Sequence, residues 1–260
     1  MNILLINDAS GYHSGCMEVL KSYDFKKSFK VNTFFRSQIK FKDFNKMVIN
    51  GEGTMHHNGV GSQAVMSWII AALREKIPIE LVNTVWQDMA PSWTPILKQL
   101  DKIEVREVLS QQDMLKRHGV ESIVVPDRSI RSDVPYKKYE YVEAYEGQYW
   151  HKRDISRFKG KLPRVNIFSH SWYELVNRLR HSDLLITGRH HEIYAAIKAR
   201  CKFIIEDGNT HKNSGVFLSA GVPVFKDLQK KQDVLDGKYN EEFEKLFEYY
   251  GQTDRSSREC

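Results

Sequence analysis

The sequence is poor in cysteine and has no long apolar run. Its 260 residues include three cysteines, Cys16, Cys201 and Cys260, an odd number without the spacing of a metal-binding motif. This usage favours a reducing compartment and predicts no metal site. No stretch of about 18 apolar residues is present, so the sequence predicts no membrane span. The first residues also lack the basic region, apolar core and cleavage site of a signal peptide, and we expect a cytoplasmic protein.

Strand and helix patterns alternate through the first half of the chain. With 41% hydrophobic and 28% charged residues, the composition is that of a globular protein long enough for one large domain or two of about 130 residues. Alternation of this kind implies a parallel sheet covered by helices. We therefore predict a Rossmann-like half over 1–127. Its predicted strands are 3–7, 46–50, 79–84, 103–109 and 122–125, and its predicted helices are 15–23, 62–76 and 110–118.

The periodicity fails over 128–163, which we interpret as a linker. The alternation returns over 164–260, so the sequence predicts a second Rossmann-like half there. Its predicted strands are 164–169, 184–187 and 202–206, and its predicted helices are 172–180, 192–200 and 239–250. We expect the last helix to pack back across the first half.

Basic residues are concentrated in two segments that also carry aromatic side chains. Residues 21–46 contain eight basic against two acidic residues, with seven aromatics among them, and residues 150–164 contain six basic residues against one acidic residue. Such segments can follow a phosphate backbone and stack bases, so nucleic acid is a candidate partner. Alternating lysine and phenylalanine is also typical of a half-buried strand or helix, and both interpretations stay open.

Ligands of parallel sheets bind where the strands end, so the loops after the strands are the places to look for chemistry. The strongest candidate follows the predicted strand 184–187, where the chain brings an arginine and two histidines to the start of a helix. A helix amino terminus attracts anions, Arg189 is a two-pronged donor for phosphate or carboxylate, and His191 can donate a proton. In the alternative interpretation Arg189 only pairs with Glu192. The donor-binding residues predicted here are Thr187, Gly188, Arg189 and His190.

The loop after the next predicted strand lies at the same edge of the sheet. It is a polar run, 205–215, rich in hydrogen-bond donors. His211 and Lys212 are suited to a second phosphate or to the acceptor, and Asn209 to a hydroxyl group. The alternative is a turn in which Asn and Gly serve the backbone alone.

Two loops of the first half carry candidate catalytic residues. After the strand 46–50, Glu52 lies between Gly51 and Gly53, which permit close approach of a substrate, and the carboxylate is suited to act as general base. The neighbouring His56 and His57 are candidates for the acceptor side. The first loop places Asp8 and His13 before a helix, where they are either catalytic or, for Asp8, a helix cap.

The sequence resembles the polysaccharide pyruvyl transferase family over most of its length. The resemblance is carried by 171–176, by 185–191 with its Arg-x-His motif, by the lysine loop 208–212, and by 105–110 and 124–127. It implies an α/β fold with two Rossmann-like halves facing across a cleft, similar to GT-B glycosyltransferases, with a compact second half on the donor side. The family usually has consecutive glycines after the third strand, where this chain has Glu52.

By this resemblance Arg189 and His191 contact the phosphate or carboxylate of an anionic donor, with Lys212 close by and His191 a candidate acid. Our first hypothesis is a glycosyltransferase that uses a nucleotide sugar, with Glu52 accepting the proton of a hydroxyl on a glycan or on hydroxymethylated DNA. The alternative is a pyruvyltransferase that forms a ketal on a polysaccharide sugar from phosphoenolpyruvate. A third hypothesis is a family member that only binds glycan or nucleic acid. We expect no cofactor, since the donor is a co-substrate.

Overall fold

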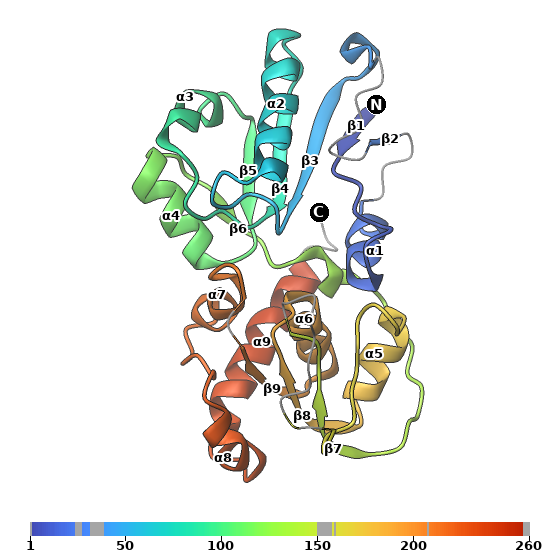
Figure 1. The fold of residues 1–260 in the computed structure, drawn as a ribbon. Coiled ribbons are helices and arrows are strands. Elements are labelled where there is room, and N and C mark those ends of the chain that lie inside the picture. The colour runs from blue at the N-terminus through green and yellow to red at the C-terminus, as the bar shows by residue number, and fades with distance from the viewer. Residues whose placement is uncertain are drawn as a thin grey trace. The chain divides into compact units, whose positions relative to one another are not determined.

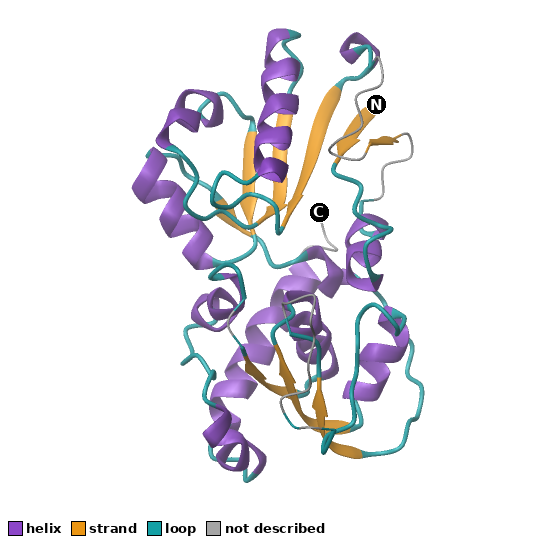
Figure 2. Ribbon diagram, in the orientation of Figure 1, coloured by secondary structure: helices purple, strands orange, loops and turns teal. Residues whose placement is uncertain are grey.

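The computed structural model describes residues 2–23, 28–31, 39–149, 158, 160–206 and 208–256. The chain divides into two compact units: unit 1 comprises Met1–Ala9 and Tyr23–Pro126, and unit 2 comprises Ser10–Ser22 and Asp127–Cys260. Each unit is α/β with a parallel sheet (Figures 1 and 2). Much of the two basic segments, namely 24–27, 32–38, 150–157 and 159, lies outside the described residues, so nucleic-acid contact there stays a prediction.

The sheet of unit 1 has six parallel strands in the order β2-β1-β3-β4-β5-β6. The central strands are apolar and buried, as expected for a parallel sheet covered on both faces. β2 was not among the predicted strands. The strands are β1 (Ile3–Ile6), β2 (Ser28–Val31), β3 (Lys46–Glu52), β4 (Ile79–Thr84), β5 (Lys102–Val105) and β6 (Ile123–Val124).

Helices α2 (Val60–Arg74), α3 (Thr94–Leu97) and α4 (Val108–His118) belong to unit 1. α2 begins two residues before the predicted start at Ser62, because Gly59 is its N-cap. α4 ends as predicted at Gly119, whose φ of 58° is the left-handed conformation that glycine favours at a helix end.

The sheet of unit 2 has three parallel strands in the order β7-β8-β9. β7 lies inside the segment that the sequence marks as irregular. Its residues alternate little in polarity, yet Ala144, Tyr145 and Glu146 are all buried. The strands are β7 (Val142–Glu146), β8 (Ser182–Thr187) and β9 (Lys202–Ile205), and the helices are α1 (Ser14–Lys21), α5 (Trp172–Leu179), α6 (His190–Ala199), α7 (Lys212–Ser219), α8 (Lys231–Leu235) and α9 (Asn240–Ser256).

The strand predicted over 164–169 does not form. Arg164 makes one isolated bridge to Glu146, and the chain then turns. The backbone groups of Ile167 bond to side chains and not to a neighbouring strand. Its N–H donates to the carboxylate of Glu192, and its carbonyl accepts from the hydroxyl of Ser14 at 3.0 Å. The second bond joins α1 to unit 2, although the sequence places α1 in the first half.

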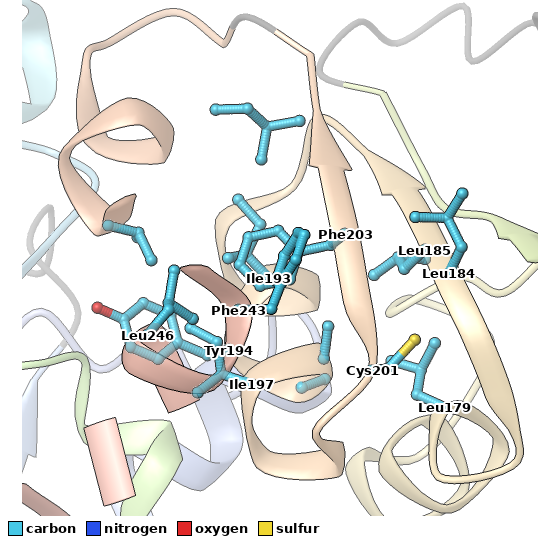
Figure 3. Close-up of a cluster of buried hydrophobic side chains, with 14 of the residues drawn as sticks. Leu179, Leu184, Leu185, Ile193, Tyr194, Ile197, Cys201, Phe203, Phe243 and Leu246 are labelled. Atoms are coloured by element: carbon cyan, nitrogen blue, oxygen red, sulfur yellow. The ribbon is translucent and has the colours of Figure 1, made fainter. Parts of the chain in front are cut away.

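The last helix, α9, belongs to unit 2 and packs into its core, and its predicted packing across the first half stays a prediction. Phe243 and Leu246 lie in the same buried cluster as Phe203 and Tyr194 (Figure 3). The hydroxyl of Tyr250 donates to the carbonyl of Val216 at 2.9 Å, which joins α9 to α7. Among the described residues, no helix is long and apolar enough to cross a membrane.

Candidate functional site

The turn after β8 presents an arginine at the start of α6, as the sequence predicts. Arg189 is the N-cap residue of this ten-residue helix, in an extended conformation. Its N–H donates to the hydroxyl of Thr187 at 3.0 Å, and the N–H of Gly188 donates to the carbonyl of Gln148 at 3.1 Å. The turn is thus held to the loop that follows β7. The backbone N–H groups and partial positive charge of a helix amino terminus favour an anion here.

Glu192 holds this turn together from within the protein. Its fully buried carboxylate accepts from the hydroxyl of Thr187 at 2.6 Å and from the N–H groups of Gln148 at 2.9 Å and Ile167 at 3.1 Å. Burial raises the pKa of Glu192 to about 7, against the lowering effect of these hydrogen bonds and of the Arg189 charge. Gly147 lies so close that a Cβ there would collide with the carboxylate. Glu192 is thus hydrogen-bonded within the turn, and Arg189 acts on it through its charge.

The guanidinium of Arg189 lies over an exposed aromatic ring that the sequence did not single out. Its carbon Cζ is 5.2 Å from the ring centre of Phe168. Tyr12 meets Phe168 edge to face, with ring centres 5.2 Å apart. Tyr12 is 57% exposed and Phe168 42%, so this aromatic pair is open to a ligand on at least one side, whereas Arg189 is half-buried. The cation–π contact stabilises the guanidinium over the ring.

His191 lies beside a buried carboxylate. Its Nε2 is 3.5 Å from Oδ2 of Asp127, a residue of the resemblance segment 124–127 that we did not place in the site. Asp127 is itself fixed, because its Oδ1 accepts from the N–H of Ser129 at 3.0 Å. Both side chains are buried. At this separation the imidazole and the carboxylate are within the distance of an ion pair.

His13 packs against His191 from α1, with ring centres 4.8 Å apart. It caps this helix: its Nδ1 accepts from the N–H of Cys16 at 3.2 Å. Burial, together with the charges of His191 and Arg189, lowers the pKa of His13 to about 2. The imidazole is therefore neutral at physiological pH. Asp8, the other residue predicted from the first loop, belongs to unit 1.

The loop after β9, predicted from the polar run 205–215, adjoins the loop after β8 through the buried side-chain amide of Asn213. The side-chain NH2 of Asn213 donates to the carbonyl of Gly188 at 3.0 Å and to that of Glu206 at 3.3 Å. Lys212 opens α7, and its Nζ donates to Oδ1 of Asn209 at 3.4 Å. The structure therefore brings the loops after β8 and β9 together at one edge of the sheet, and His211 is the N-cap residue of α7.

In unit 1, Glu52 is a buried member of an ion pair. Its carboxylate accepts from Nη1 of Arg106 at 3.2 Å and from the amide of Asn50 at 3.4 Å. Its φ of 47° lies in the left-handed region, a strained conformation for a residue with a side chain. Gly51 is required as glycine, because a Cβ there would collide with Thr84 of β4. Gly53 directly follows Glu52, the last residue of β3.

The two histidines predicted on the acceptor side form a partly exposed group in unit 1. Nδ1 of His56 is 2.9 Å from Nδ1 of His57, and Nε2 of His57 is 3.3 Å from Oδ2 of Asp88. The loop of His56 is joined to Gln87 by an isolated bridge. These contacts show how the loop is held, and a role in binding an acceptor stays a prediction.

Comparison with known proteins identifies the fold but no family. The sequence matches no protein-family model and no curated protein. Among solved structures, an uncharacterised Klebsiella pneumoniae protein is similar with a TM-score of 0.58 and 10% identity, over 84% of this chain and 87% of that one. The UDP-GlcNAc 2-epimerase of Neisseria meningitidis, solved with UDP-GlcNAc, gives 0.55 and 9%, over 95% and 94%. The S. aureus protein MnaA, solved with UDP, gives 0.54 and 10%, over 95% and 91%.

These similarities confirm the predicted fold class: an α/β chain with two Rossmann-like halves of the GT-B type. At such low identity they identify a fold and no activity. Membership of the polysaccharide pyruvyl transferase family stays a prediction.

Proposed function

We propose that the protein is a glycosyltransferase that takes its sugar from a nucleotide-sugar donor. The observation that carries the proposal is Arg189, held at the amino terminus of α6 beside the loop of Lys212. The link between the two loops is the Asn213 amide, which donates to the Gly188 carbonyl at 3.0 Å. Two cationic side chains and a helix terminus form a site for the diphosphate of such a donor, whose leaving charge they stabilise without a metal.

The chemistry of the similar folds supports this choice of donor. The Neisseria meningitidis structure contains UDP-GlcNAc and the S. aureus structure contains UDP. In our proposal His191, beside Asp127, contacts the donor and supplies a proton where one is needed. Glu52 as the general base toward the acceptor hydroxyl, and His56 and His57 as acceptor-side residues, stay predictions. The acceptor carries its hydroxyl on a glycan or on modified DNA.

The pyruvyltransferase alternative rests on the same arginine, because a guanidinium binds a carboxylate as well as a phosphate. Ligand-induced thermal stabilisation separates the two donors, since a ligand that binds only the folded protein stabilises it by mass action. We expect UDP-sugars to raise the melting temperature and phosphoenolpyruvate to leave it unchanged. Stabilisation by phosphoenolpyruvate alone would favour pyruvyl transfer, and stabilisation by neither would refute the proposed donor site.

The variant that tests the site is Arg189→Lys, which keeps the charge and removes the planar fork. We expect donor affinity to fall at least about tenfold, equivalent to about 1.4 kcal/mol. The matched control is Arg200→Lys, because Arg200 is exposed and pairs with Glu244 at the surface of the same unit. Equal affinity of both variants would exclude Arg189 from the site. Mass analysis of products from a mixture of donors would then identify the transferred group.

A further inference from the structure

Three side chains with metal-ligating atoms converge where α1 packs against α6. His13 and Cys16 are three residues apart at the start of α1, and His191 comes from the first turn of α6. One ligand atom of each lies within 4.8 Å of the other two. Sγ of Cys16 is 3.6 Å from Nε2 of His13. All three residues belong to unit 2.

We propose that His13, Cys16 and His191 bind a divalent metal ion, with Zn²⁺ as the ion that suits them. Zinc bound to sulfur at about 2.3 Å and to nitrogen at about 2.0–2.1 Å in a tetrahedron places neighbouring S and N ligands about 3.5 Å apart. The separation of 3.6 Å between Sγ of Cys16 and Nε2 of His13 is close to this value. One thiolate and two imidazoles form a borderline-soft set that suits zinc and excludes Mg²⁺ and Ca²⁺, which prefer oxygen.

The surroundings of the three ligands have the features of a metal site. Asp127 lies 3.5 Å from Nε2 of His191, a buried carboxylate of the kind that accompanies metal-bound histidines. Gly15, between the two ligands of α1, allows the helix to approach the His191 ring. Three protein ligands leave the fourth position of a tetrahedral ion open to water or to an anion.

Metal binding requires two proton movements. The thiol of Cys16 releases its proton to solvent and binds as the thiolate. In the metal-free protein the N–H of Cys16 donates to Nδ1 of His13, so the imidazole proton is on Nε2. An ion on Nε2 moves this proton to Nδ1, which can then no longer accept the hydrogen bond from Cys16. The hydrogen bond that is lost joins two neutral groups, with 3.2 Å between the backbone nitrogen of Cys16 and Nδ1 of His13. It is weak compared with a zinc–nitrogen bond.

The cysteine count predicted no metal site because it examined the spacing between cysteines alone. The third ligand is distant in sequence and reaches the other two only through the packing of α1 on α6. The proposed site shares His191 with the proposed function, whose proton-donor role for this residue applies to the metal-free protein. Cobalt binding needs no donor and no acceptor, so the two proposals can fail separately.

Cobalt(II) is the probe for the purified full chain, because a Co²⁺–thiolate bond gives a charge-transfer band and a tetrahedral site gives visible bands. Cys260, outside the described residues, is replaced by serine in all samples to remove its thiol. We expect one equivalent of Co²⁺ to produce both features and Zn²⁺ to abolish them. Cys16→Ser should lose the charge-transfer band and bind Co²⁺ at least tenfold more weakly.

The matched control is Cys201→Ser, a second buried thiol of unit 2, whose pKa is raised well above its usual range by burial. It should retain the spectrum. His13→Gln is the second test, should Cys16→Ser fail to fold by circular dichroism: it should keep a charge-transfer band with at least tenfold weaker binding. The proposal is overturned if the parent protein shows no charge-transfer band, if Cys16→Ser keeps it, or if Cys201→Ser loses it equally.

Discussion

Gly15 and His191 approach each other so closely that no side chain fits between them. A Cβ atom on Gly15 would lie 2.7 Å from both Cβ and Cγ of His191. These atoms are next to the backbone of α6, so the ring cannot move aside without shifting the helix. The contact sets the position of His13 on α1 relative to His191, and with it the geometry of the proposed metal site.

Gly15→Ala should destabilise the protein and disturb His191. Alanine is favoured over glycine in a helix by about 1 kcal/mol. Overpacking a buried site costs about 1–3 kcal/mol, so the collision should outweigh the propensity gain and leave a net loss of up to about 2 kcal/mol. Chemical denaturation measures this loss, and the Co²⁺ spectrum reports whether the ligands have moved.

Gly11→Ala is the control for this substitution. Gly11 lies in the same segment of unit 2, and a Cβ there would meet nothing within 4 Å. We expect its stability to match the parent within about 0.5 kcal/mol. If Gly15→Ala proved as stable as Gly11→Ala, the close packing of α1 on α6 would be wrong.

The parts of the fold that could be predicted are those whose structure follows from the pattern of apolar and polar residues within one short segment. β4, at Ile79–Thr84, was predicted with its observed bounds, because a short, mostly apolar run indicates burial directly. Arg189 and Lys212 were predicted after the ends of parallel strands, and the structure places them after β8 and β9, while their role in binding stays a prediction. In contrast, the strand predicted over 164–169 was wrong, since the polar groups of Ile167 bond to side chains from distant segments.

The contacts around Arg189 and His191 could not be predicted from the sequence, for the same reason. Asp127 beside His191, Phe168 under Arg189 and α1 packed in unit 2 all join segments far apart in the chain. Periodicity describes one segment at a time, and nothing in it reports which distant side chain will face another. The Val-Val-Pro-Asp segment ending at Asp127 was the one signal available, through the family resemblance.

Glu192→Gln should destabilise the turn that carries Arg189. Its carboxylate accepts from two backbone N–H groups and from Thr187, whereas an amide has one oxygen and would direct its NH2 at a backbone donor. An unsatisfied buried donor costs about 1–3 kcal/mol. The comparison is Glu244→Gln at an exposed pair, which should cost less than about 1 kcal/mol. Similar losses for both variants, measured by denaturant unfolding, would contradict the role assigned to Glu192.

His118 should make unit 1 sensitive to acid. It is buried in the last turn of α4, with Nδ1 2.8 Å from the hydroxyl of Thr94. Burial lowers the pKa of His118 below its ordinary 6.5; Arg117 adds to this and Asp113 opposes it. The unfolded chain therefore takes up the proton first. The stability from this group is present above pH 6.5 and is lost as the pH falls toward the lowered pKa of the folded state.

The measurement is the free energy of unfolding from about pH 7.5 down to about pH 5 for the parent and for His118→Gln. We expect the parent to lose stability more steeply than the variant over this range, because the glutamine does not titrate. Parallel curves would show that His118 takes up its proton equally in both states.

Glu52 combines a strained backbone with a buried ion pair, and its two candidate roles predict different results for Glu52→Gln. As the partner of Arg106, at 3.2 Å, it stabilises a guanidinium that is only 1% exposed. The glutamine carbonyl still accepts a hydrogen bond but carries no charge, so we expect a loss of about 1–3 kcal/mol in stability. As a general base it would also be required for transfer, and the variant would lose activity at temperatures where it remains folded.

A double-mutant cycle with Arg106→Gln separates the two roles. If the ion pair accounts for the loss of stability, the double variant should be less destabilised than the sum of the single variants by about 0.5–3 kcal/mol. Full transfer activity in folded Glu52→Gln would remove it as the base and leave it as the counter-ion of Arg106. Loss of activity in Glu52→Gln, with activity retained in Arg106→Gln, would instead explain why a strained position with φ of 47° keeps a carboxylate where glycine would relieve the strain.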